Sequence, residues 1–362
     1  MSLATALAIV GVGVALARGE RERRAAARKR RARSSSLLDG EPPVAALRRV
    51  IVGQLDIAIE LLQDYPGESS EHTVHETRKA LKRARAILRL LRDQLGDKRL
   101  AHENAALRDC ARRLAGARDA VVALDTLDGL LKRHPKLTDS HRRRGAKAVR
   151  DLRARLLAER EGAIVDGGRG GYALGDTAST PERVEIERHG AVALELLAIR
   201  GRIAAWEPKD PRRASSSKLP AGGVERLYRQ GRRRMRRARR RRGDATAMHT
   251  WRKSAKDLRY VAETLNRTGA SAQDKSSKRL KRVARRADRL GEILGDEHDL
   301  AMLDQAVRSH AKRLPARKRD YKPLLKAIER RRKRLRKQAL RNGERLYGRK
   351  PRRFVRRVRG AL

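Results

Sequence analysis

The chain has 362 residues, with 92 lysines and arginines against 43 aspartates and glutamates, which gives a formal net charge of +49. Hydrophobic residues still make up 39% of the chain, which excludes wholesale disorder, and a single cysteine, Cys110, excludes an internal disulfide framework and a cysteine-based zinc site. Aromatic residues make up only 2%, so few side chains are available for stacking nucleic-acid bases. The composition favours a polyanionic partner, and by itself it favours nucleic acid bound through its phosphates.

The first element in chain order is an apolar, uncharged stretch at residues 3–17, which a basic stretch from Arg18 to Arg33 follows. As a helix it would be about 23 Å long at ~1.5 Å per residue, which is shorter than the ~20 residues of a membrane span. Its positive charge follows the apolar run, whereas in a secretory signal it precedes it. We expect the segment 1–36 to contain a short helix packed on protein. In the alternative it is a membrane tether that keeps the body in the cytoplasm.

From Val44 onward, apolar residues recur at spacings of three and four, and no alternation typical of strands is present, so the fold class is predicted to be all-α. The first helix is expected to stop at Pro66-Gly67. Glycine-rich residues 162–181 and proline- and serine-rich residues 207–223 predict two breaks. The basic tail, residues 348–362, is expected to be loose after Arg349. Further helices are expected at about 71–94, 98–132, 138–161, 181–206, 224–242, 245–267, 274–312 and 319–347.

A sequence motif occurs twice, at an offset of 174 residues. Each copy reads His-x-x-Arg-Lys-x-x-Lys-x-x-Arg, and the copies begin at His75 and His249. On a helix with about 100° per residue, these cations form one stripe ~120° wide, which Arg89 extends in the first copy. Because like charges one turn apart destabilise a helix, a stripe that occurs twice indicates an anion held along it. The alternative is a solvated charged face, with each histidine in a capping or packing role.

A second echo lies one predicted helix later, where Leu114–Asp119 (LAGARD) corresponds to Leu294–Asp299 (LGDEHD). Both segments continue with apolar residues. Asp119 and Asp299 are expected to pair with a neighbouring basic side chain and to orient it.

The two repeat helices, each followed by a helix with L-x-x-x-[RH]-D, resemble a CHAD domain, a conserved-histidine α-helical domain. The resemblance covers about residues 43–347, with a first half at about 43–206 and a second half at about 224–347. It implies two antiparallel helical bundles, related by a pseudo-two-fold axis, around a basic central groove or pore that binds inorganic polyphosphate. The polyphosphate-binding residues that it implies are His75, Arg78, Lys79, Lys82, Arg85, Arg89, Arg112, Arg118, His249, Arg252, Lys253, Lys256, Arg259, Arg289 and His298. One departure between the halves is Arg118, where the second half has His298.

CHAD domains are often joined to a triphosphate-tunnel domain of the CYTH type, which carries E-x-E-x-K on a strand. This chain has Glu185-Ile186-Glu187-Arg188-His189 in a helical context, which we interpret as a chance match without triphosphatase activity. The sequence also lacks a phosphate-binding P-loop, H-E-x-x-H and G-x-S-x-G, so no enzyme activity, cofactor or metal is predicted. One helix clusters four carboxylates, for which nearby arginines are expected to be the partners: Glu292, Asp296, Glu297 and Asp299.

The sequence therefore predicts a non-enzymatic polyphosphate-binding protein in the cytoplasm, with polyphosphate granules as its expected location. The surrounding anion should raise the histidine pKa values, so binding is expected to tighten below about pH 6.5. Two further basic clusters, Arg226–Arg242 and Lys326–Arg359, form either a solvated surface or an outer shell that grips long polymer. The alternative function is a nucleic-acid-compacting protein, for which nucleic acid would compete with polyphosphate on equal terms.

Overall fold

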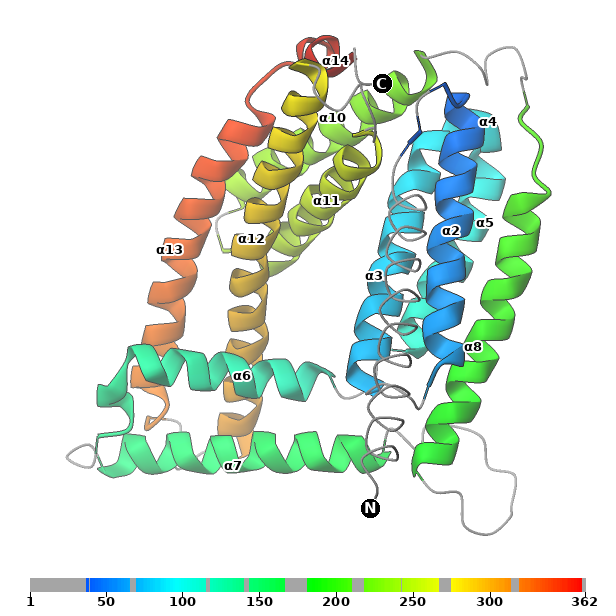
Figure 1. Cartoon of the computed structure of the whole chain (residues 1–362). Coiled ribbons are helices and arrows are strands. Elements are labelled where there is room, and N and C mark those ends of the chain that lie inside the picture. Colours follow the sequence, from blue (N-terminus) through cyan, green and yellow to red (C-terminus); the bar gives the residue numbers. More distant parts are fainter. Residues whose placement is uncertain are drawn as a thin grey trace, which may run out of the picture.

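The computed structural model of the chain consists of α-helices and short 3-10 turns, without a strand among the described residues (Figure 1). The structure describes residues 37–359 apart from 39, 66–69, 115–117, 140–142, 167–180, 210–217, 242, 267–274 and 314–318. The all-α prediction is confirmed. The apolar stretch 3–17, its basic flank and most of the two predicted breaks lie outside the described residues. None of the helices described is long and apolar enough to cross a bilayer.

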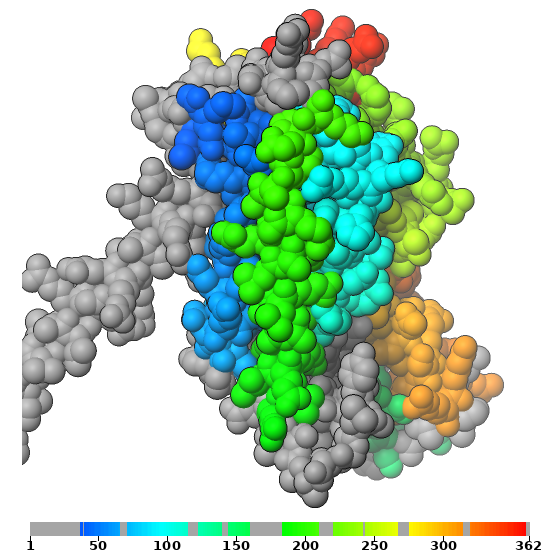
Figure 2. Space-filling view, turned by 90° about the vertical axis from the view of Figure 1, so that its right-hand side faces the viewer, coloured from blue at the N-terminus to red at the C-terminus, as the bar shows by residue number. Residues whose placement is uncertain are grey.

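Four helices pack together as an N-terminal bundle: α2 (Pro43–Gln63), α3 (Ser70–Leu88), α5 (Asp97–Arg113) and α8 (Pro181–Ala204). α2 and α5 each contact both α3 and α8. From Leu88 the chain of α3 continues through a 3-10 turn, Arg89–Leu91, into the short helix α4, Arg92–Leu95, so these elements together occupy the helix predicted at 71–94. Figure 2 shows α8 in the middle of one face of the molecule, between α2 and α5.

Four further helices form a C-terminal bundle: α10 (Lys218–Arg240), α11 (Ala245–Thr264), α12 (Lys275–Arg313) and α13 (Lys322–Tyr347). α11 contacts α10 and α12, and α13 contacts the same two helices. The start of α11 is fixed by Asp244, whose side chain accepts a hydrogen bond of 3.0 Å from the backbone N–H of Ala247, as an N-cap residue does. The predicted ranges of these helices hold to within a few residues, except that α10 begins earlier, at Lys218.

The prediction of one helix over residues 98–132 is wrong. α5 ends at Arg113, and a new helix, α6 (Arg118–Arg133), begins after a turn. In the sequence Gly116 falls between these two helices, and a glycine inside a helical pattern is a weak point of a helix. α6 and α7 (Arg143–Asp166) form a pair that extends across to the lower part of α12, which α6 contacts (Figure 1). The corresponding stretch of the C-terminal bundle continues without a break as α12.

The tail after Arg349 is not loose, as the sequence predicted, because it forms helix α14 (Pro351–Val358). Its apolar side chains are buried while its arginines are exposed. Phe354 stacks on Tyr228 of α10 with 3.9 Å between the ring centroids. The many arginines of this segment made it look like a disordered tail. Its three apolar residues, Phe354, Val355 and Val358, are buried and lie on one side of a short amphipathic helix.

Two ion pairs join α11 to the α3 side of the N-terminal bundle. Arg89 Nη1 lies 3.0 Å from Asp257 Oδ1, and Arg83 Nη2 lies 3.5 Å from Glu263 Oε2. The offset of 174 residues relates Arg83 to Asp257 and Arg89 to Glu263. Each ion pair therefore joins the first of these repeat positions in one helix to the second in the other. The basic residue of each pair comes from the first repeat and the acidic residue from the second. They bring the two repeat helices together in the middle of the molecule.

Candidate functional site

The two histidines predicted in the second half come together at the α11–α12 seam. The rings of His249 and His298 are in contact, with 4.3 Å between their centroids and an angle of 33° between their planes. Burial, then the neighbouring His298 and Lys253, lower the pKa of His249 to about 4, so this ring is neutral at pH 7. Its buried Nδ1 makes no hydrogen bond within the described part of the chain. The predicted rise of the histidine pKa values refers to the complex with a bound anion. For His249 this rise would start from the lowered pKa of about 4 in the free protein.

The next two cations of this repeat lie across glycines of α12. A methyl group added at Gly295 would lie 3.1 Å from Arg252 Nη2, and one added at Gly291 would lie 3.6 Å from Lys256 Cγ. A glycine inside a helix costs ~1 kcal/mol relative to alanine. The two glycines are one turn apart; Gly295 makes room for Arg252, whereas a methyl group at Gly291 would lie at an ordinary contact distance from Lys256. Arg252 and Lys256 are both half-buried, so their polar ends remain within reach of solvent.

Arg259 ends the series by pairing with Asp288 of α12, and its Nε also lies 2.7 Å from Glu263 Oε1. Arg259 therefore already has two carboxylates as partners. The repeat positions on α11 meet α12 in one antiparallel register, with contacts spaced by three or four residues: His249 with His298, Arg252 with Gly295, Lys256 with Gly291, and Arg259 with Asp288.

In the N-terminal bundle, the last two cations of the stripe share an acceptor on α5. Arg85 Nε and Arg89 Nη2 donate to Asn104 Oδ1 at 3.0 and 3.3 Å. Burial and the adjacent Arg89 lower the pKa of Arg85 to about 10, so it stays protonated at neutral pH in a positive environment. The pairing of Arg89 with Asp257 neutralises one charge here. These residues form the inner end of the first stripe, next to α11.

The outer end of the first stripe is more open to solvent. His75 is exposed, with 54% of its side chain accessible, and its Nε2 lies 3.9 Å from Glu76 Oε1. Lys79 Nζ lies 3.0 Å from the same carboxylate oxygen. Arg78 and Lys82 are half-buried along the same helix. The structure thus places all six predicted cations of the first repeat on α3 and the turn that follows it.

The remaining predicted residues are exposed or lie outside the described residues, although the charge of Lys253 still acts on His249. Arg112 is exposed and pairs with Asp109 at 3.0 Å. Arg289 and Lys253 are exposed on α12 and α11. Arg118 begins α6, and its side chain lies outside the described residues, as does that of Asp119. Among the four clustered carboxylates of α12, Glu297 is buried and pairs with arginines, as predicted. Its Oε1 lies 3.0 Å from Arg332 Nη2 and 2.9 Å from Arg336 Nε.

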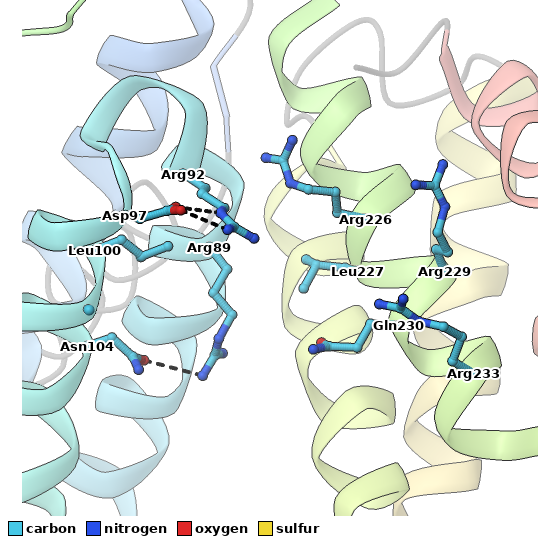
Figure 3. Close-up of a pocket in the computed structure, with 11 residues that line it drawn as sticks. Arg89, Arg92, Asp97, Leu100, Asn104, Arg226, Leu227, Arg229, Gln230 and Arg233 are labelled. Carbon is cyan, nitrogen blue, oxygen red and sulfur yellow. Dashed lines mark hydrogen bonds and ion pairs between the residues drawn. The ribbon is translucent and has the colours of Figure 1, made fainter. Parts of the chain in front are cut away.

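A cleft of about 610 Å³ lies between the two bundles, and Figure 3 shows the side chains that enter it from both sides. Arg89, Asn104 and the Arg92–Asp97 pair come from the N-terminal bundle, with 2.7 Å between Arg92 Nε and Asp97 Oδ1. The opposite wall is α10, and among the described residues no aromatic side chain lines the cleft. The α10 residues that line it are Arg226, Leu227, Arg229, Gln230 and Arg233.

Sequence reasoning missed the residues that position the cations. Arg234 of α10 is one of them, because its Nη1 donates to Ser254 Oγ at 2.8 Å and to the Thr250 carbonyl at 3.3 Å. Burial lowers the pKa of Arg234. The glycines of α12 were detectable in principle, since Gly291-x-x-x-Gly295 interrupts a strong helical pattern without ending the helix. Asp257 and Asn104 gave no signal, because their roles depend on contacts between segments far apart in the sequence.

Comparison with known proteins agrees with this architecture. A family model described as the CHAD domain matches residues 54–308, which is more than half of the chain. The chain is also similar to the crystal structure of the CHAD domain from the plant Ricinus communis, with a TM-score of 0.52, 17% sequence identity, and coverage of 91% of this chain and 94% of that chain. No curated protein matches the sequence. The chain therefore belongs to the CHAD domain family.

Proposed function

We propose that this protein binds inorganic polyphosphate, without catalysis, along the cationic seams of its two bundles. The observation that carries the proposal is the α11–α12 seam, where Gly295 leaves room for Arg252 and Lys256 packs beside Gly291 one turn away. Two glycines in the middle of a long helix cost stability, so their presence needs a reason. A set of cations held at regular spacing matches a polymer that carries about one negative charge per phosphate.

The two seams and the cleft would form one continuous basic groove, related by the repeat. Arg89 supports this continuity, because it belongs to the first repeat, contacts Asp257 of α11 and also lines the cleft. Arginine offers two parallel N–H groups to phosphate oxygens, while lysine offers a compact charge. The groove would hold a flexible chain by many such contacts and release its counterions, so binding should weaken steeply with salt.

Polyphosphate fits the cleft better than nucleic acid does. Proteins that hold single-stranded nucleic acid stack bases on aromatic rings or arginine planes, at ~1–3 kcal/mol per base. The cleft has no aromatic lining, and the described tyrosines and tryptophans that are fully buried serve the core, such as Trp251 and Tyr228. A ligand without bases loses nothing in such a site. We further propose that the protein acts in the cytoplasm, at polyphosphate granules.

A matched pair of variants tests the proposal. The seam variant replaces Arg78, Lys82, Arg252 and Lys256 with alanine, and the control variant replaces Arg352, Arg353, Arg356 and Arg357, which are exposed on α14. Both lose four positive charges. One lost charge-assisted hydrogen bond costs ~1.5–3 kcal/mol, so the seam variant should bind labelled polyphosphate at least about tenfold more weakly than the control. Equal losses in both variants would show that the seams are not the site. Phosphate release from polyphosphate by the wild type, with Mg²⁺ present, would overturn the non-enzymatic part.

A further inference from the structure

One helix of this highly charged protein presents an apolar face to solvent. Within the described residues, the exposed large hydrophobic side chains are Ile186, Leu194 and Leu197, with 43%, 68% and 42% of their surface accessible. All three lie on α8, at the centre of the face shown in Figure 2. Small residues extend the same exposed strip, which comprises Ile186, Gly190, Ala191, Leu194, Leu197, Ala198, Gly201 and Ala204, the α8 face.

Three charged side chains of α8 beside this strip are bound to neighbouring helices of the same chain, while the exposed Arg183 and Glu187 pair with each other near the N-terminal end of the helix. Arg200 Nε lies 2.5 Å from Asp56 Oδ1 of α2, and Arg202 Nη2 lies 2.8 Å from Glu103 Oε2 of α5. Glu195 pairs with Arg113 of α5. These contacts draw the charges sideways into the bundle, so they do not cover the α8 face.

The wall formed by α2 and α8 carries no net charge, unlike the most basic helices of the molecule. α8 contains four basic and four acidic residues, and α2 contains two of each. In contrast, α10 contains ten basic residues and one acidic residue, and α13 contains eleven and two. Two copies that each carry +49 repel one another through most approaches. This repulsion is weaker at the wall of α2 and α8 than at α10 or α13, even with α5 beside it, which contains five basic and three acidic residues.

The order of residues along the α8 face is itself symmetric. Counted outward from the point between residues 195 and 196, Leu194 mirrors Leu197, and Gly190 mirrors Gly201. A two-fold interface requires a surface that is complementary to itself. A methyl group added at Gly190 or Gly201 would meet nothing within 4 Å, so both glycines leave open notches beside the leucines.

We propose that the α8 face is the docking surface for the α8 face of a second copy of this chain, with the two helices antiparallel about a two-fold axis. The axis passes between residues 195 and 196, so Glu187 of one copy lies near Ala204 of the other. The glycine notches let the two backbones approach closely, and the apolar leucines leave water. Salt strengthens this association, because screening weakens the repulsion between the two cationic bodies over the ~10 Å Debye length at 0.1 M. Binding of a polyanion shows the opposite dependence on salt.

Sedimentation velocity of the full-length protein tests the dimer. The wild type should shift from monomer to dimer with rising concentration, and the shift should occur at lower concentration in 0.5 M than in 0.1 M salt. Leu194→Glu should abolish the dimer, whereas Gln338→Glu, the same charge change at an exposed site on α13, should leave it intact. Unchanged melting temperatures show that both variants fold. A wild type that stays monomeric under all these conditions, or a Leu194→Glu variant that still dimerises, overturns the proposal.

Cross-linking tests the orientation. A mixture of Glu187→Cys and Ala204→Cys proteins, treated with a flexible bis-maleimide, should give covalent dimers of unlike chains, while each variant alone should give few. Cys110 is buried and provides no competing thiol. Dimers within Glu187→Cys alone would indicate parallel helices and contradict the proposed axis. A monomer in which a Leu194→Cys thiol is slow to react would show that another segment of the same chain covers the α8 face, which also refutes docking of a second copy.

Discussion

The glycines of α12 offer the sharpest perturbation of the proposed site. Gly295→Leu favours the helix by ~0.8 kcal/mol, so it should not unfold the protein. Its side chain, however, would fill the path of Arg252, whose Nη2 lies only 3.1 Å from the position of an added methyl group. If Arg252 leaves the seam, the complex loses one charge-assisted hydrogen bond, worth ~1.5–3 kcal/mol. The expected result is a loss of polyphosphate affinity of about 10- to 100-fold, at 1.4 kcal/mol per tenfold.

Fluorescence anisotropy with labelled polyphosphate measures this loss, and a double-mutant cycle with Arg252→Ala assigns its cause. If Gly295→Leu acts through Arg252, the double variant binds no worse than Arg252→Ala alone. Gly291→Ala is the matched control, because the added methyl would lie at an ordinary 3.6 Å from Lys256 Cγ and should leave affinity unchanged. Fully additive losses, or a Gly295→Leu variant that is stable and binds normally, would refute the reasoning.

Three further predictions follow from buried groups. Glu297→Gln removes the buried carboxylate that pairs with Arg332 and Arg336 and leaves both arginines with the exposed Glu329 alone. Breaking a buried ion pair costs ~3–5 kcal/mol, so the urea midpoint should fall; an unchanged midpoint would contradict this. Phe354→Ala should free α14 and make it sensitive to protease, while uniform resistance would show that its stacking is dispensable. A bound polyanion should raise the pKa of His249 from about 4, so the complex takes up a proton and affinity rises as pH falls toward 4; His249→Ala should remove this rise, and flat wild-type affinity from pH 4.5 to 8 would exclude it.

The pH experiment needs a stability control with a defined sign. The folded pKa of His249 lies below its ordinary value of 6.5, so the unfolded chain binds the proton more readily. Its contribution to stability is therefore complete above about pH 6.5 and is lost as pH falls toward 4. Thermal melts at each pH separate this loss from the expected gain in affinity.

The sequence allowed the helical class, most helix positions and the placement of the first-repeat cations to be predicted, because all three follow from a period of 3.6 residues. The resemblance to the CHAD domain placed His249 and His298 among the residues of one groove, but it did not predict the contact between their rings that the structure shows. Periodicity did not show that α5 ends at Arg113, since the apolar pattern continues into α6. It also did not reveal α14, whose buried side chains are outnumbered by arginines.

What the sequence could not show arises from contacts between distant segments. Arg83 and Asp257 occupy equivalent positions in the two copies of the repeat, and in the sequence they appear only as a basic residue replaced by an acidic one. Only the crossing of α3 and α11 shows that each finds an opposite charge, on Glu263 and Arg89. Likewise, the sequence of α8 did not show which of its leucines would be exposed, and Leu194 is exposed because nothing in the described chain packs on that side.

A competition titration tests the central claim most directly. Labelled long-chain polyphosphate would be bound at near-physiological salt and challenged with duplex DNA, RNA, heparin and short polyphosphates, each matched by charge. The proposed site, with its spaced cations and no aromatic lining, predicts that only polyphosphate competes well. Equal competition by every polyanion would contradict a shaped site, reduce the +49 to a generic attraction, and make nucleic-acid compaction the better account.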